Sequence, residues 1–71
     1  MNNNKLITFG SKVREARKQQ GISQEKLAEL SDTDRSYMGR IERGEKNVTL
    51  TKIYQIADAL KISITELFDE S

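Results

Sequence analysis

Apolar residues recur along this chain with the spacing that is typical of helices. Phe9, Val13 and Ala16 fall at positions i, i+4 and i+7, which predicts an amphipathic helix over residues 6–20. No segment alternates apolar and polar residues for long enough to predict a strand. The pattern therefore predicts an all-α fold, a compact domain of five helices. The four later helices are expected near residues 23–30, 35–43, 49–60 and 63–68. Thr49 is a plausible cap of the fourth helix, and Ser63 with Glu66 forms a capping box at the start of the fifth.

The segment from Gly21 to Asn47 is the most informative part of the chain. Ser23 is a suitable N-cap for a short helix, and residues 31–34 (SDTD) interrupt the helical pattern with types that favour caps and turns. A second short helix follows, and Gly44 stands where a helix end favours a left-handed residue. Two helices this short cannot form a hydrophobic core alone, so their expected role is to expose the outward side of the second helix to a binding partner. Its outward side suits the DNA major groove, with Arg35, Ser36 and Arg40 as base-reading candidates.

The motifs SQEKLA at residues 23–28 and YMGRIERG at residues 37–44 resemble the Cro/phage-repressor type of helix-turn-helix protein, the XRE family. The similarity spans roughly residues 8–68. It implies a lambda-repressor-like DNA-binding domain over residues 6–71 that ends in a dimerisation helix, with residues 1–5 as a flexible tail. The size of the chain and the start of the second helix look most like restriction–modification controller proteins, which activate or repress depending on occupancy.

The resemblance also implies residues that contact the DNA backbone. In the family, a glutamine at the position of Gln24 bonds a phosphate and orients the recognition helix, and a helix N-terminus suits an anion. Tyr37 has two interpretations, since its ring can stack against sugar and phosphate or partly fill the core. The residues after the recognition helix are expected to contact phosphates and to fix the register without reading sequence: Arg43, Lys46 and Asn47.

Glu42 is expected on the inward side of the recognition helix, beside Ile41. A buried carboxylate must be paired, because burial of an isolated charge is costly. Arg17 occupies the place where the family has an arginine that bonds this glutamate. We therefore expect a structural ion pair between Arg17 and Glu42 rather than DNA contacts by either residue.

The C-terminal part of the chain offers more apolar surface than one small domain needs. In related small repressors and controller proteins, the last helices form a two-fold dimer interface. The alternative is that these residues only complete the core of the monomer, and both interpretations can be partly true. The candidate interface residues are Leu60, Ile62, Ile64, Leu67 and Phe68.

Composition narrows the possible functions. The 71 residues suffice for one domain and include neither cysteine nor histidine, so disulfides, thiolate metal sites and histidine-activated nucleophiles are excluded. We expect no enzyme activity, no metal, no cofactor and no small-molecule ligand. The net charge is only +1, but residues 1–46 have ten basic residues against seven acids, and residues 47–71 have two against four. This asymmetry favours contact of the N-terminal part with phosphate, although a mixed surface with chance asymmetry explains it equally well.

These features predict a sequence-specific transcriptional regulator that binds double-stranded DNA as a homodimer at a near-palindromic operator. A small phage-type or biofilm-type repressor is nearly as well supported as a controller protein. The rival from another class is an antitoxin-like module that binds a protein toxin and DNA only secondarily. Antitoxins usually add a segment that wraps the toxin, and none is visible here. No apolar run approaches a membrane span or a signal peptide, so a cytoplasmic location without a membrane partner is expected.

Overall fold

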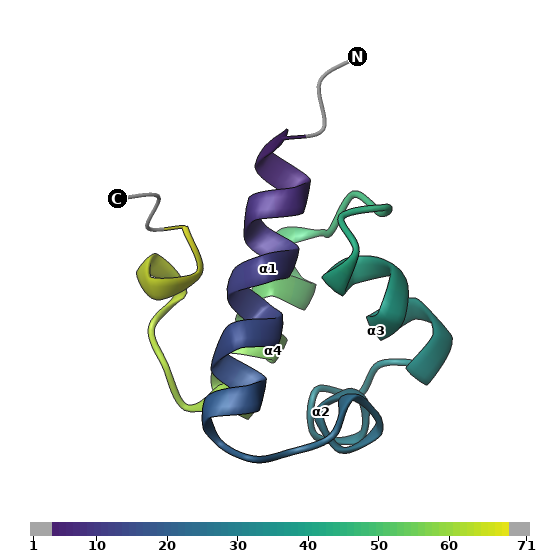
Figure 1. The fold of residues 1–71 in the computed structure, drawn as a ribbon, viewed down its shortest axis with the longest axis vertical. Coiled ribbons are helices and arrows are strands. Elements are labelled where there is room, and N and C mark those ends of the chain that lie inside the picture. The colour runs from purple at the N-terminus through teal and green to yellow at the C-terminus, as the bar shows by residue number, and fades with distance from the viewer. Residues whose placement is uncertain (1–3, 69–71) are drawn as a thin grey trace.

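The computed structural model describes residues 4–68, and the regular secondary structure in that range is entirely helical (Figure 1). The all-α prediction is therefore confirmed, and the described residues form no strand. Helix α1 begins two residues earlier than expected, so that Asn4 and Lys5, assigned to the tail from sequence, lie in its first turn. Residues 1–3 of that expected tail lie outside the described residues. The elements are α1 (Asn4–Gln19), α2 (Gln24–Leu30), α3 (Arg35–Glu42), α4 (Leu50–Leu60) and the 3-10 helix η1 (Ile64–Leu67).

The expected fifth α-helix is only a single 3-10 turn. Ser63 and Glu66 form the capping box that the sequence indicated, but the turn they start spans four residues. Its backbone bonds join residues three apart, from the Glu66 N–H to the Ser63 carbonyl (3.1 Å) and from the Phe68 N–H to the Thr65 carbonyl (3.1 Å). Nucleating an α-helix is costly, and so short a segment adds too few bonds to offset that cost.

Side chains that accept hydrogen bonds from the first turn fix the starts of the middle helices. Ser23 accepts from the Lys26 N–H at 2.9 Å, and Thr49 accepts from the Lys52 N–H at 3.1 Å, so both expected caps are confirmed. Asp34 caps α3 through the N–H groups of Ser36 (2.9 Å) and Tyr37 (3.3 Å). Because Asp34 directly precedes Arg35, this cap places the first candidate base-reading residue at the N-terminus of α3.

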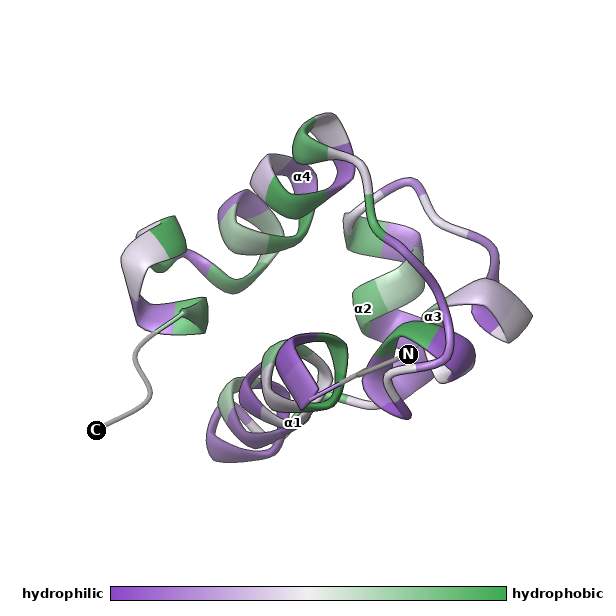
Figure 2. Ribbon diagram, turned by 90° about the horizontal axis from the view of Figure 1, so that it is seen from above, coloured by the Kyte–Doolittle hydropathy of each residue, from purple (hydrophilic) through white to green (hydrophobic). Residues whose placement is uncertain are grey.

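The apolar faces of the helices meet in one core, which α1, α2, α3 and α4 surround (Figure 2). The buried apolar residues come from every element: Phe9, Val13, Leu27, Ala28, Met38, Ile41, Ile56, Ala57, Leu60 and Leu67.

No helix in the described part of the chain has the length and apolar character needed to cross a membrane.

Helices α1 and α3 approach each other closely at Gly10. A Cβ atom at this position would overlap the carbonyl oxygen of Ile41 and would lie 2.6 Å from that of Glu42. The glycine therefore allows the backbone of α1 to lie against the C-terminal end of α3, and this contact helps to set the direction in which α3 is presented.

Candidate nucleic-acid interface

The three candidate base-reading residues lie together on the solvent-exposed side of α3. Arg35, Ser36 and Arg40 are exposed, whereas the opposite side of the helix, including Met38 and Ile41, is buried in the core. The exposed side forms one wall of a shallow hollow that also includes the first residue of α2. The hollow is lined by Gln24, Arg35, Ser36, Gly39, Arg40 and Arg43.

A buried hydrogen-bonded network connects three helices behind this hollow. The guanidinium of Arg17 in α1 donates to both carboxylate oxygens of Glu42 in α3, at 2.8 and 3.0 Å. Arg17 also donates to the Ile22 carbonyl at 3.1 Å. The side chains of the pair are 11% and 3% exposed, so water screens the charges little. The structural ion pair expected from the sequence is therefore present and connects α1 to α3.

Gln24 in α2 is the third member of this network. Its side-chain nitrogen donates to Oε1 of Glu42 at 3.1 Å. A carboxamide nitrogen has two hydrogens, so one remains for an acceptor outside the protein. Gly39 leaves room for this arrangement, because a Cβ there would lie 3.3 Å from the Gln24 side-chain oxygen. The network thus fixes the N-terminus of α2 beside the exposed side of α3.

The expected phosphate-contacting residues after α3 are partly engaged within the protein. Arg43 donates to both oxygens of Glu45, at 3.0 and 3.3 Å, and this pair is exposed. The hydrogen bond from Arg43 holds the pKa of the Glu45 carboxyl below its ordinary value. Glu45 therefore stays ionised near neutral pH and competes with any phosphate for Arg43. The sequence reasoning did not identify this competing carboxylate.

Tyr37 connects α3 to the following loop. Its ring packs against the core, and its hydroxyl donates to the Asn47 carbonyl at 3.5 Å. The ammonium of Lys46 lies 5.8 Å from the centre of the same ring, within cation–π range. The Tyr37 ring therefore partly fills the core, as one of its two interpretations expected. Its contacts also place Lys46 and Asn47 beside α3.

The candidate dimer residues divide into two groups. Leu60 and Leu67 are buried in the core cluster of this chain, so the expectation that they lie on an accessible interface is wrong, and they instead complete the core of the monomer. Ile62 and Ile64 are half-buried. Phe68 stacks on Phe9, with ring centroids 5.4 Å apart, yet remains 49% exposed.

Two exposed apolar residues of α4 were not identified as interface candidates. Leu50 is 65% exposed, and Tyr54 is 49% exposed. They are four residues apart and therefore share one side of the helix. Lys52, between them, reaches the opposite side, where it bonds the end of α2. The i, i+4 spacing of Leu50 and Tyr54 was the available signal.

Comparisons with known proteins agree with this geometry. The family model described as helix-turn-helix matches residues 13–67. The control protein C.BamHI of Bacillus amyloliquefaciens is 44% identical over 70 residues, which cover 97% of this chain and 86% of that protein. The crystal structure of the restriction–modification controller protein C.AhdI from Aeromonas hydrophila has a TM-score of 0.87 and 52% identity, covering 89% of this chain and 96% of that one.

A third relative has been solved with DNA. C.Esp1396I bound to a 25 base pair operator site has a TM-score of 0.80 and 32% identity, covering 89% of this chain and 83% of that one. The match to the family model covers most of the sequence, and both controller proteins align with nearly the whole chain. The chain therefore belongs to the helix-turn-helix family, of the XRE type, and its relatives include control proteins of restriction–modification systems.

Proposed function

We propose that this protein is a sequence-specific DNA-binding transcriptional regulator that acts as a restriction–modification controller. The observation that supports the proposal best is the exposed row of Arg35, Ser36 and Arg40 on a helix whose orientation is fixed from behind by a buried ion-pair network. An operator-bound relative with the same fold supports it further. We infer no catalytic activity, since the relatives are control proteins, and none of the comparisons favours the antitoxin alternative.

The arrangement suits recognition in the major groove. An arginine can form two hydrogen bonds with guanine O6 and N7, and a serine hydroxyl can donate to or accept from a base edge. The proposed backbone contacts lie around α3: Gln24 at the start of α2, Tyr37 in the first turn of α3, and Arg43, Lys46 and Asn47 after its C-terminal end. These contacts would fix the register of α3 along the groove.

We propose further that the active species is a homodimer. The longest principal extent of the described chain is 31 Å. Recognition helices that enter successive major grooves are about 34 Å apart, which is longer than this extent. Each copy contributes one α3, so contact with two successive grooves requires two copies. The proposed interface combines the exposed side chains Leu50, Tyr54 and Phe68 with the half-buried Ile62 and Ile64.

Selection of bound duplexes from a random DNA pool tests the proposal directly. We expect a near-palindromic sequence with two half-sites about one helical turn apart. Replacing Arg35 with alanine should relax the preference at one position of each half-site, with a loss of about 1–3 kcal/mol for the preferred base. Replacing Lys46 with alanine should weaken all sequences alike. Failure to enrich any sequence would contradict the proposed function.

A further inference from the structure

The exposed side of α1 has two positive side chains that take no part in the network around Glu42. Arg14 and Lys18 are both exposed, and neither makes an ion pair or a side-chain hydrogen bond with any residue in the range 4–68. They are four residues apart, so they lie one turn above each other on the same side of the helix. A shallow hollow lies on this side, lined by Ser11, Arg14, Glu15, Lys18 and Gln19.

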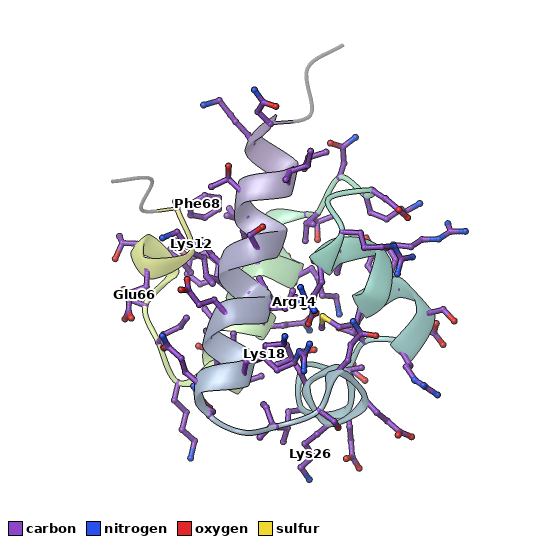
Figure 3. All side chains as sticks on the ribbon, viewed as in Figure 1. Lys12, Arg14, Lys18, Lys26, Glu66 and Phe68 are labelled. Atoms are coloured by element: carbon purple, nitrogen blue, oxygen red, sulfur yellow. The ribbon has the colours of Figure 1, made fainter. Side chains whose placement is uncertain are left out.

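The position of Arg17 relates this pair to the interface. Arg14 lies one turn before Arg17, the arginine that bonds Glu42, and Lys18 is the last lysine before the end of α1 at Gln19. Glu42 is also the partner of Gln24, at the N-terminus of α2. Arg14 and Lys18 lie on the side of α1 next to α2 and α3, the two helices that line the proposed DNA site (Figure 3).

Figure 3 distinguishes this side of α1 from the opposite one. Arg14 and Lys18 project on the side of the helix next to α2 and α3, whereas Lys12 lies on the side next to Phe68 and Glu66. Lys12 likewise makes no ion pair with a described residue. Lys12 therefore provides a cation on the same helix that lies away from the proposed interface.

We propose that Arg14 and Lys18 form an auxiliary binding site for the DNA backbone, adjacent to the phosphate that Gln24 would contact. Duplex DNA has one negative charge per about 1.7 Å of helix axis, so phosphates continue along the strand beyond any single contact. Exposed cations without partners can neutralise such phosphates without first breaking an internal ion pair. In this respect they differ from Arg43, which is bonded to Glu45. The site adds affinity without sequence preference and rests on the proposed DNA-binding function.

The test compares three single substitutions that remove the same charge from the same helix: Arg14→Gln, Lys18→Gln and the control Lys12→Gln. Binding to a labelled random-sequence duplex is measured by fluorescence anisotropy. The duplex has about 30 base pairs, a length that would span two half-sites. The series runs from about 50 to 200 mM salt, a range over which phosphate contacts change affinity strongly.

Each substitution at the proposed site should flatten the log–log salt dependence by about 0.9 for every phosphate that the variant no longer neutralises. The affinity at about 0.1 M salt should fall roughly five- to tenfold, since neutralising one phosphate changes it about eightfold per tenfold change in salt. Arg14→Lys should restore most of the slope because it retains the charge. Lys12→Gln should resemble the wild type. All variants should melt like the wild type, because none of the substituted side chains makes an ion pair or a side-chain hydrogen bond with a described residue.

Slopes for Arg14→Gln and Lys18→Gln that match that of Lys12→Gln would overturn the auxiliary site. The outcome for the parent proposal is separate. If the wild-type protein binds neither the random duplex nor a selected one, the DNA-binding function fails as a whole. If it binds with a steep salt dependence that these substitutions do not change, only the auxiliary site fails.

Discussion

At the scale of single residues, Glu42 is the acceptor on which the interface depends. Its carboxylate bonds Arg17 from α1 and Gln24 from α2 while it belongs to the last turn of α3. A charge in this position is stabilised only as long as its partners remain, because water reaches little of it. The same side chain therefore affects both stability and the position of the DNA-contacting residues.

Replacing Arg17 with alanine should destabilise the free protein strongly. The substitution leaves the Glu42 charge buried without its guanidinium, and breaking such a pair typically costs about 3–5 kcal/mol. That is a large share of the stability of a domain this small. Urea and thermal unfolding provide the measurement, with Arg14→Ala as the matched control at an exposed arginine one turn away. Normal unfolding combined with lost DNA binding would instead place Arg17 at the DNA surface.

Replacing Glu45 with glutamine should strengthen DNA binding. The wild-type carboxylate holds Arg43 at 3.0 Å, and it is ionised at neutral pH as any exposed glutamate is, with a pKa that the Arg43 hydrogen bond lowers further. This interaction is fully present above the ordinary carboxyl pKa and is lost as the pH falls through the lowered value of the folded state. Without the charge, Arg43 is free to bind a phosphate, and the salt slope should steepen by up to about 0.9.

The control for this experiment is Glu29→Gln, which removes an equal charge from another exposed ion pair, with Lys26 at 3.6 Å. An increase in affinity of the same size in both variants would show that only the net charge matters. It would contradict a specific release of Arg43.

At the scale of elements, two contacts besides the Arg17–Glu42 pair hold the helix-turn-helix pair against the remaining helices. The first is the close approach of α1 to α3 at Gly10. The second is Lys52 in α4, whose ammonium donates to the carbonyls of Ser31 (3.3 Å) and Asp32 (3.0 Å) at the C-terminal end of α2. A cation at this end of a helix also interacts favourably with the helix dipole.

Replacing Gly10 with alanine should separate α1 from α3. The added methyl group would overlap backbone atoms of Ile41 and Glu42, which cannot move away as a flexible side chain can. Overpacking of this kind typically costs about 1–3 kcal/mol and occasionally more. Denaturant unfolding should show this loss, whereas Ser11→Ala, at the exposed neighbouring position, should change little. Equal stabilities would mean that the two helices have room to shift.

Replacing Lys52 with methionine should loosen the turn between α2 and α3. The apolar stem is retained, but two hydrogen bonds from a charged donor are removed at a half-buried position, for a cost of about 1–3 kcal/mol. Amide hydrogen exchange should accelerate at Thr33, whose N–H bonds the Ala28 carbonyl at 2.8 Å within this turn. Lys26→Met, at an exposed lysine of α2, serves as the control. Unchanged exchange at Thr33 would show that α4 does not hold the turn.

At the scale of the whole molecule, assembly decides how many base pairs can be recognised. One recognition helix contacts only a few base pairs, which gives too little selectivity among competing genomic sites. Two copies related by a two-fold axis double the contacts and require a near-palindromic operator. The proposed interface lies on α4 and around η1, away from the exposed side of α3, so dimerisation and DNA binding would not compete for the same surface.

Replacing Tyr54 with aspartate should weaken assembly without unfolding the chain. The side chain is half-exposed in the monomer, so the charge stays hydrated there but would be buried at a two-fold contact. We expect a folded monomer in sedimentation at micromolar concentration and a much lower operator affinity. Ile7→Asp, at an equally exposed apolar residue (49%) on α1, is the control for sedimentation only, because Ile7 packs against Gly44 beside the proposed phosphate contacts. A wild-type chain that is monomeric both free and on its operator would refute the dimer.

The sequence by itself determined the helical fold class, the caps at Ser23 and Thr49, and the pairing of Arg17 with Glu42. The caps and helical stripes follow from side chains that interact within one or two turns, and the local sequence specifies such contacts. The ion pair followed from a family motif together with the high cost of burying an unpaired carboxylate.

Only the tertiary structure decided which apolar residues of the C-terminal part are covered. Leu60 and Leu67 are buried whereas Leu50 and Phe68 remain exposed, although all four fit an apolar helical pattern. Periodicity indicates which side of a helix is apolar, but burial depends on what packs against it. The competition of Glu45 for Arg43 and the reach of Lys52 to α2 also depend on loop and helix positions that no local pattern specifies. These contacts join residues through space, so their existence depends on the packing of the whole domain.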